Sequence, residues 1–364
     1  MSLFLSRLRT GGRRPSVSLL ISNGFSTSLR QTPPYSILGA KPCGQDFGRL
    51  IVHYANLRSW IHLDKRVPMN LVHDDEKTQT IGASHGWIAT LKDDGILRLQ
   101  DDFNPVTSDI DPIRIQMPPL VTLPHCQTKI ITNVSMSSSF PEDDEDCVVA
   151  VKFLGPQLSF CKPAGKSRKP EWTNIKIENP CFYSSRVMFS KKDNMFRMPG
   201  SGGHLIGSWD PCNPSDDPKL QRVRFTNIPK LTNDEQNLMD SCSKSEHLVE
   251  SRPTGETFLV KQYKKTAKNE EGVAIMKTEI LMVFKLDEEG NAVYTQDIGD
   301  LTMFLSMSEP FCVPSTSFPG LARNYIRVLD VNEIGCVNVA NIPFSIGSIN
   351  VSYSTPYYFP PQDY

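Results

Sequence analysis

The sequence contains no closely spaced pair of cysteines and no histidine motif typical of a metal site. Its nine cysteines are scattered between Cys43 and Cys336 without a Cys-x-x-Cys pair, and its seven histidines include neither His-x-His nor His-Glu-x-x-His. Zinc ribbons and dithiol redox sites need ligands paired at such spacings. We therefore predict no metal and no cofactor, and the odd number of cysteines argues against a secreted disulfide scaffold.

Long apolar runs are also absent. No stretch approaches the ~18 apolar residues of a membrane-spanning helix, so no transmembrane segment is predicted. The 364 residues are 39% hydrophobic and 22% charged, with a mean hydropathy of -0.31. This composition is typical of a folded globular protein and excludes wholesale disorder. The length allows one large all-β domain or about two ordinary domains.

Acidic side chains are absent from the first 45 residues, because the first one in the chain is Asp46. This leader, residues 1–45, carries a charge of +6, whereas the remainder, with 33 basic and 40 acidic residues, carries -7. Apolar side chains within residues 3–8 can form one face of a helix beside Arg7 and Arg9, and a stretch rich in Ser and Thr follows. An Arg-rich, Ser-rich and acid-free leader is typical of an organellar transit peptide.

We therefore expect residues 1–45 to be a transit peptide and linker, unstructured or helical, that is recognised by the organelle import machinery. The Arg-rich amphipathic start favours the mitochondrion, with the chloroplast or dual targeting as the alternative. A disordered basic tail is the simpler alternative. A secretory signal is disfavoured, because the longest apolar run in the leader is only Leu19-Leu20-Ile21.

Short β-rich runs separated by turn residues dominate the chain from about residue 80. The runs 85–91 and 96–100 flank Asp93-Asp94-Gly95, in which glycine supplies the positive φ of a tight hairpin turn. Further predicted strands are 147–154, 157–161, 185–189, 194–198, 204–209, 222–227, 247–250, 256–263, 276–286, 292–297, 325–331 and 336–339. Helices are expected only at 48–58 and within 232–242. The pattern predicts an all-β sandwich, barrel or propeller.

The motif most suggestive of a reaction is Gly82-Ala83-Ser84-His85-Gly86, which matches the G-x-S-x-G nucleophile elbow. A nucleophile elbow places its serine between a buried strand and a helix. Here the polar segment 73–77 precedes the motif and a hairpin follows it. We therefore interpret the motif as a tight glycine turn that leads into a strand anchored by Trp87.

Two glycine-containing motifs are also interpreted without a ligand. Gly165-Lys166-Ser167 resembles the end of a phosphate-binding loop, but Phe160 stands where that loop requires its first glycine. Gly200-Ser201-Gly202-Gly203, which could form an anion nest, is predicted to be a turn between strands.

A group of lysines around Tyr263 is the one feature suggestive of RNA binding, and its members are Lys261, Lys264, Lys265 and Lys268. The negative charge of the remaining chain and the absence of an RNA-binding motif favour a solvated hairpin tip instead. Nucleic-acid binding is therefore disfavoured.

Four groups of segments carry a family resemblance when they are taken in order. They are 82–89 with its Ser-His-Gly-Trp string, 158–163 followed by Trp172, 248–251 followed by 257–263, and 283–287 followed by 298–305 and 318–326. Together they resemble the plant KIB-type β-propeller family, which is often found behind an F-box, over roughly residues 50–340. The resemblance implies a propeller and a structural role for the Ser-His-Gly string. The leader does not resemble an F-box, so the chain is similar to an organelle-targeted branch and the ubiquitin-ligase adaptor role is not carried over.

We thus predict an all-β chain in which residues 46–355 form a single propeller of about six or seven four-stranded blades and residues 356–364 form a C-terminal tail. We interpret the protein as a mitochondrial, non-catalytic platform for an unknown organellar protein partner, because propellers hold loops on a rigid frame. Small-ligand binding or catalysis at the channel mouth is the alternative, with His85, His204 and Asp210 as candidate polar groups, and organellar RNA binding is the third. No catalytic, cofactor-binding or metal-binding residue is assigned.

Overall fold

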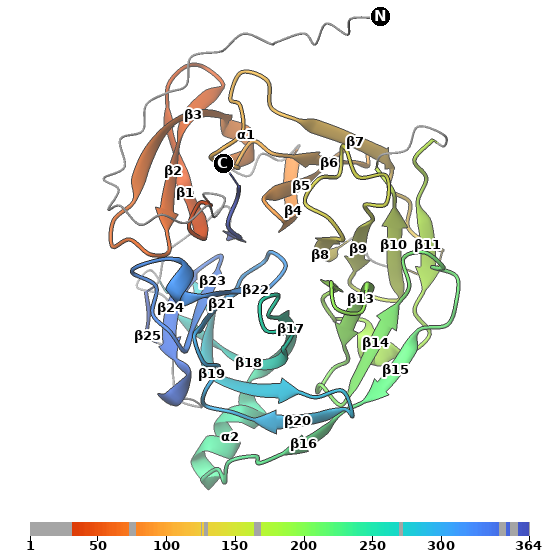
Figure 1. The fold of residues 1–364 in the computed structure, drawn as a ribbon, viewed down its shortest axis with the longest axis vertical. Helices are drawn as coiled ribbons and strands as arrows, with labels where there is room; N and C mark the ends of the chain where they lie inside the picture. Colours follow the sequence, from red (N-terminus) through yellow and green to blue (C-terminus); the bar gives the residue numbers. More distant parts are fainter. Residues whose placement is uncertain are drawn as a thin grey trace, which may run out of the picture.

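The computed structural model describes residues 31–72, 78–124, 126, 130–163, 169–268, 272–341, 347–349 and 356–363. Six β-sheets follow one another around a ring, so the fold is a six-bladed propeller (Figure 1). Four blades have four strands and two have five. This confirms the predicted all-β class and the lower of the two expected blade numbers. The predicted leader helix and Gly165-Lys166-Ser167 lie outside the described residues.

The first four blades each contain four antiparallel strands, which are named from the inner edge outwards. Blade 1 contains β26 (Tyr358–Phe359), β1 (Tyr35–Pro42), β2 (Phe47–Tyr54) and β3 (Ile61–Pro68). Blade 2 contains β4 (Thr78–Ser84), β5 (Trp87–Lys92), β6 (Ile96–Gln100) and β7 (Arg114–Pro119). Blade 3 contains β8 (Ile131–Met136), β9 (Val149–Phe153), β10 (Gln157–Cys161) and β11 (Thr173–Lys176). Blade 4 contains β12 (Met188–Ser190), β13 (Met195–Pro199), β14 (Leu205–Trp209) and β15 (Lys219–Arg222).

The last two blades each include a parallel strand pair. Blade 5 contains β17 (Ser243–Glu250), β18 (Thr257–Lys268), β19 (Ala274–Leu286), β20 (Asn291–Tyr294) and, parallel to β20, β16 (Arg224–Thr226). Blade 6 contains β22 (Phe311–Pro314), β21 (Leu301–Leu305), β23 (Tyr325–Asp330), β24 (Glu333–Asn338) and β25 (Gly347–Ile349), with β21 parallel to β23. The short helix α1 (Met69–Val72) connects blade 1 to blade 2.

The two ends of the described chain close the ring together. The C-terminal strand β26 pairs with β1, which brings the C-terminal end of the chain beside blade 1 (Figure 1). The Tyr35 and Phe359 rings stack with centroids 5.1 Å apart. Blade 1 thus takes one strand from the predicted leader and one from the predicted tail, so the boundaries 46–355 were too narrow. The reason is burial: Tyr35, Ile37, Tyr358 and Phe359 are all enclosed in the core, although their neighbours have the composition of a linker.

The two predicted helices have opposite outcomes. Residues 232–242 do contain a helix, α2 (Asn233–Ser241), which begins with a capping box between Thr232 and Glu235. The helix predicted at 48–58 was wrong, because residues 48–54 belong to β2 and residues 55–58 form a turn and irregular chain. Leu50 and Val52 are buried while Arg49 is exposed, which is the two-residue period of a strand. No helix within the described ranges is both long and apolar enough to cross a membrane.

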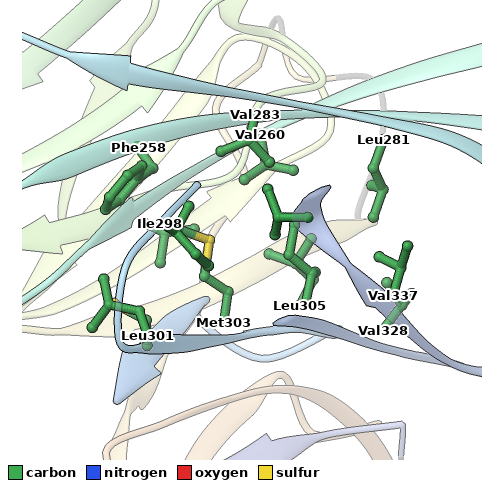
Figure 2. Packing of buried hydrophobic residues seen from close by; sticks show 14 residues of the cluster. Phe258, Val260, Leu281, Val283, Ile298, Leu301, Met303, Leu305, Val328 and Val337 are labelled. Carbon is green, nitrogen blue, oxygen red and sulfur yellow. The ribbon is translucent and has the colours of Figure 1, made fainter. Parts of the chain in front are cut away.

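Apolar side chains from neighbouring blades pack into the space between the sheets. Figure 2 shows one such cluster, which contains Phe258 and Val283 of blade 5 together with Met303 and Val328 of blade 6. Burying a side chain of this size contributes about 1.5–3 kcal/mol. Similar clusters join blades 2 and 3 and blades 3 and 4. The ring is therefore a rigid frame for the loops that follow the inner strands.

Candidate functional site

A cavity of about 470 Å³ lies where the inner strands of five blades meet. Its walls include residues of β4, β12, β17, β22 and β26, together with the turns that follow several of them. The inner strands contact one another around the ring, from β4 through β8, β12 and β17 to β22. The volume lies in the range of about 300–1,000 Å³ that is usual for ligand pockets.

The predicted turn at Ser84-His85-Gly86 forms one wall of this cavity. Strand β4 ends at Ser84, and the positive φ values of His85 (52°) and Gly86 (91°) reverse the chain into β5. Any Cβ at position 86 would collide with the Gln362 side chain, so glycine lets the turn pack against the C-terminal segment. Trp87 is buried and donates from Nε1 to the Ser139 carbonyl at 2.9 Å. The interpretation as a turn into a strand anchored by Trp87 is confirmed.

A chain of hydrogen bonds runs through this turn from Glu309 to Arg252. Ser84 Oγ donates to Glu309 Oε2 at 2.6 Å and lies 2.9 Å from His85 Nδ1. Arg252 Nη2 donates to His85 Nε2. A guanidinium can only donate, so Nε2 must accept and Nδ1 must carry the hydrogen that it donates to Ser84. Each side chain thus donates a hydrogen bond to the next, from Arg252 through His85 and Ser84 to Glu309. His85 is a neutral imidazole with a single tautomer.

Charge and burial keep His85 neutral. Burial lowers the pKa of His85 to about 3, with a further contribution from the positive charges of Arg252 and Lys191. Burial raises the pKa of Glu309, while hydrogen bonds from Ser84 and from the Phe189 backbone N–H, at 2.8 Å, oppose that rise. His85 therefore does not titrate between pH 5 and 8.

This geometry differs from that of a nucleophilic triad. In a triad the histidine accepts the serine proton at one nitrogen and is held by a carboxylate at the other. Here the Ser84 proton points to Glu309, and the only lone pair of the His85 ring points to Arg252. Cys312 also lines the cavity, and burial raises the pKa of its thiol to about 12, so it stays protonated. Neither residue is arranged as a nucleophile.

Arg252 differs from the acidic residues of the cavity in the number of its unused hydrogen-bonding groups. The Glu250 carboxylate accepts from Ser190 Oγ and from the backbone N–H groups of Lys191 and Lys192, at 3.0 and 3.2 Å. Arg252 lies in the turn after β17, is exposed, and hydrogen-bonds only His85 within the described part of the chain. The cavity therefore offers free donors from a cation beside carboxylates that are already satisfied.

The other predicted polar candidates lie elsewhere. His204 is exposed at the start of β14, where its ring contacts Phe225 edge-on with centroids 4.9 Å apart. Asp210 accepts from the Cys212 N–H at 2.8 Å and from Asn213 Nδ2 at 3.2 Å, and these bonds lower its pKa. Neither residue lines the cavity, so only His85 of the three predicted groups belongs to it.

The lysines near Tyr263 are largely engaged within blades 5 and 6. Lys261 lies over the Phe225 ring, with Nζ 3.9 Å from its centroid, and burial lowers its pKa. Lys264 forms an ion pair with Asp330. Lys265 and Lys268 are exposed. The four lysines that are close in the sequence therefore do not form one basic surface, because two contact other side chains and two are exposed.

A second, much smaller cavity of about 40 Å³ lies between residues of blades 5 and 6 and Arg186, which precedes β12 of blade 4. Arg186 donates to the Ser306 carbonyl at 2.7 Å, and Lys264 and Asp330 form their ion pair on its wall. His247 is buried, its Nε2 lies 3.1 Å from Gln262 Oε1, and its Nδ1 has no hydrogen-bond partner among the described residues. A cavity of this size has room for one water molecule.

Sequence reasoning missed Arg252, Glu309 and Glu250 as cavity residues. Arg252 directly follows a segment that carries the family resemblance, but nothing in its local sequence indicates that it meets His85, 167 positions away. Within the described ranges, no group of three or more His, Cys, Asp or Glu side chains could hold a metal ion.

Comparison with known families settles the relationship that the four groups of segments suggested. The model of the KIB1-4 beta-propeller family matches residues 59–345, which is most of the chain. The protein belongs to the KIB1-4 β-propeller family. The propeller extends beyond the matched range at both ends. In blade 1, strands β1 and β2 precede the matched range and β26 follows it.

Solved structures that resemble this KIB-family propeller are distant in sequence. A putative 6-phosphogluconolactonase from Bacteroides uniformis is 12% identical, with 91% of this chain and 99% of that chain covered and a TM-score of 0.39. The Cps50 (Swd1) β-propeller domain from Myceliophteria thermophila is 9% identical, with 78% and 88% covered and a TM-score of 0.35. A comparison with curated proteins finds no match.

Proposed function

We propose that this KIB-family propeller is a non-catalytic interaction platform of the mitochondrion and that its partner binds at the cavity. The observation that carries the proposal is the cavity of about 470 Å³, where segments from five blades meet on a rigid frame. Loops held by a rigid scaffold are well suited to recognition. The Ser84 and Cys312 geometry, which lacks an activated nucleophile, supports a role in binding rather than catalysis.

Blocking the cavity tests the proposal directly. Ser317 is exposed and lines the cavity, so Ser317→Trp should fill its mouth without disturbing the core. Ser184→Trp is the matched control, because Ser184 is also exposed and does not line the cavity. In affinity capture from purified mitochondria, we expect a specific partner with the wild type and with Ser184→Trp, but not with Ser317→Trp. The same proteins captured with all three baits would contradict the proposal.

The mitochondrial address is supported by the acid-free leader, and blade 1 restricts where processing can occur. The Thr32 N–H donates to the Gln362 carbonyl at 2.8 Å, and the Gln362 N–H donates to Thr32 Oγ1 at 2.9 Å. Cleavage beyond Thr32 would remove these bonds, and cleavage beyond Tyr35 would also shorten β1. For a C-terminally tagged full chain in plant cells, we expect mitochondrial signal and a new N-terminus before Thr32. An intact cytosolic protein would contradict the address.

A small organic ligand is the second candidate, because the cavity volume of about 470 Å³ suits one. A ligand that binds the folded state raises its stability as ligand concentration increases. We expect at least one member of a broad metabolite panel to raise the melting temperature of the purified chain, and to lose this effect with Ser317→Trp. No shift with any compound would count against this second candidate.

A further inference from the structure

We propose that the cavity binds an organic carboxylate through Arg252, and that Glu309, Ser84 and His85 are positioning residues that orient its guanidinium. This inference rests on the proposed binding function and names the chemistry that the cavity recognises. The carboxylate can belong to a small metabolite or to an acidic side chain of a protein partner.

The first argument is the number of free donors on Arg252. A guanidinium carries five N–H donors in a planar fork that matches the two oxygens of a carboxylate. One of these donors is used by His85, within the described part of the chain. The neighbouring carboxylates of Glu250 and Glu309 already accept hydrogen bonds from Ser190, Ser84 and backbone N–H groups. The remaining donors are therefore available to a ligand.

The second argument is preorganisation. An exposed arginine normally loses considerable side-chain entropy when it binds, and that loss weakens binding. Arg252 is held by His85, whose ring is held by Ser84, whose hydroxyl is oriented by Glu309 and by the Met136 N–H at 3.2 Å. Because His85 accepts at Nε2 only while Nδ1 carries the hydrogen, loss of Ser84 would release both the ring and the guanidinium.

The third argument concerns the rest of the ligand. Aromatic and proline side chains form much of the cavity wall, including Phe189, Phe311, Phe318, Pro310, Pro314 and Pro360. Such walls suit an apolar or aromatic body beside the charged group. Two carboxylates, Glu250 and Glu309, line the same cavity as Arg252, so each negative charge on a ligand meets some repulsion. A monoanionic carboxylate is repelled less than a dianionic phosphate ester.

Binding of 3-phenylpropionate to the purified full chain tests the proposal, with the neutral 3-phenylpropionamide as the matched probe. By calorimetric titration we expect saturable binding of the acid and none of the amide. Arg252→Gln should weaken binding of the acid about tenfold or more, the equivalent of one charge-assisted hydrogen bond. Arg224→Gln is the control, because Arg224 is exposed on β16 away from the cavity. Equal binding of acid and amide, or undiminished binding by Arg252→Gln, would overturn the proposal.

The positioning chain needs a readout that a merely structural role would not change. We expect Ser84→Ala to weaken binding of 3-phenylpropionate severalfold and Ser84→Thr, which keeps the hydroxyl, to restore most of it. Nitrogen NMR should show His85 as the Nδ1–H tautomer in the wild type and as a mixture in Ser84→Ala. An unchanged tautomer together with unchanged affinity would refute the positioning role.

Further probes distinguish the source of the carboxylate. The blocked peptide Ac-Ala-Phe-Glu-Ala-NH2, compared with its Gln counterpart, represents a partner side chain, and phenyl phosphate represents a dianion. Tighter binding of the Glu peptide than of 3-phenylpropionate identifies a protein segment as the source, and the reverse identifies a small acid. Tighter binding of phenyl phosphate would overturn the assignment. If Ser317→Trp abolishes partner capture while Arg252→Gln binds all probes normally, the platform stands and this inference fails.

Discussion

Two histidines of this propeller each lie beside an arginine, but the cavities that they line differ in size and in the exposure of that arginine. His85 and Arg252 line a cavity of about 470 Å³ and the guanidinium is exposed, whereas His247 and Arg186 line a cavity of about 40 Å³ and the arginine is partly buried. At the smaller cavity the Lys264 and Asp330 charges are paired, and Arg186 donates to the Ser306 carbonyl.

This difference shows how the same residue types serve binding in one place and stability in another. At the smaller cavity the Lys264 charge is paired with Asp330, so the energy of this ion pair contributes to folding. At the larger cavity Arg252 hydrogen-bonds only His85 within the described part of the chain, so its other donors are available to a ligand. Changes at the smaller cavity should therefore reduce stability most, whereas removal of Arg252 should reduce binding and leave stability almost unchanged.

The largest effect should come from Asp330→Asn. This change leaves Lys264, whose side chain is only 18% exposed, without its counter-charge beside Arg186. Removing one partner of a largely buried pair usually destabilises by about 3–5 kcal/mol. We expect a loss of this size in urea unfolding. Glu178→Gln, which removes an exposed pair with Lys176, should have a much smaller effect on stability, because solvent screens exposed pairs. Equal costs for the two variants would contradict the comparison.

Ser84→Ala should have the next largest effect. Glu309 Oε2 would lose its 2.6 Å donor inside the protein, and an unsatisfied group of this kind costs about 1–3 kcal/mol. Ser317→Ala is the control, because this serine also lines the cavity but is exposed. Chemical denaturation should separate the two variants. A neutral result for Ser84→Ala would show that the chain from Glu309 to Arg252 contributes nothing to stability.

The pH dependence of stability should reveal His247. Burial lowers its pKa to about 3, from 6.5, so below pH 6.5 the unfolded state binds a proton that the folded state does not. Stability due to this residue is therefore complete above pH 6.5 and is lost as pH falls towards 3. One proton corresponds to about 1.4 kcal/mol per pH unit. His247→Gln should reduce the slope of the unfolding free energy against pH, between pH 6 and 5, by nearly this amount. The control is His204→Gln, because His204 is exposed.

The smallest effect on stability should come from Arg252→Gln. Its exposed guanidinium contributes little to folding, so we expect a change within about 0.5 kcal/mol. The same variant should lose carboxylate binding, and this pair of results is what distinguishes the Arg252 cluster from the Arg186 cluster. A large loss of stability would assign Arg252 to the folded frame and not to a ligand.

Local signals in the sequence were sufficient for the hairpins. The turn at Asp93-Asp94-Gly95 was predicted from its glycine, and Gly95 does adopt a positive φ of 72° between β5 and β6. Such turns are decided by the steric freedom of one residue, so they need no distant partner. The same applies to α2, whose capping box joins Thr232 and Glu235.

Signals that depend on distant neighbours were misread or missed. The segment of β2 was predicted as a helix, whereas its pairing with β1 and β3, which is not visible in the local sequence, makes it a strand. Lys152 lies in a predicted strand, and nothing nearby shows that it is fully buried with its ammonium at the carbonyls of Gly155 and Tyr183, both 3.0 Å away.

By itself, therefore, the sequence determined the all-β class, most strand positions after residue 80, the turn at Ser84-His85-Gly86 and, by resemblance, the family. These follow from local periodicity and backbone sterics. Only the tertiary structure decided that β26 joins β1 and that Glu309, 225 positions after Ser84, meets it at the cavity. Ring closure brings such segments together, and no local preference of the chain encodes the contacts that result.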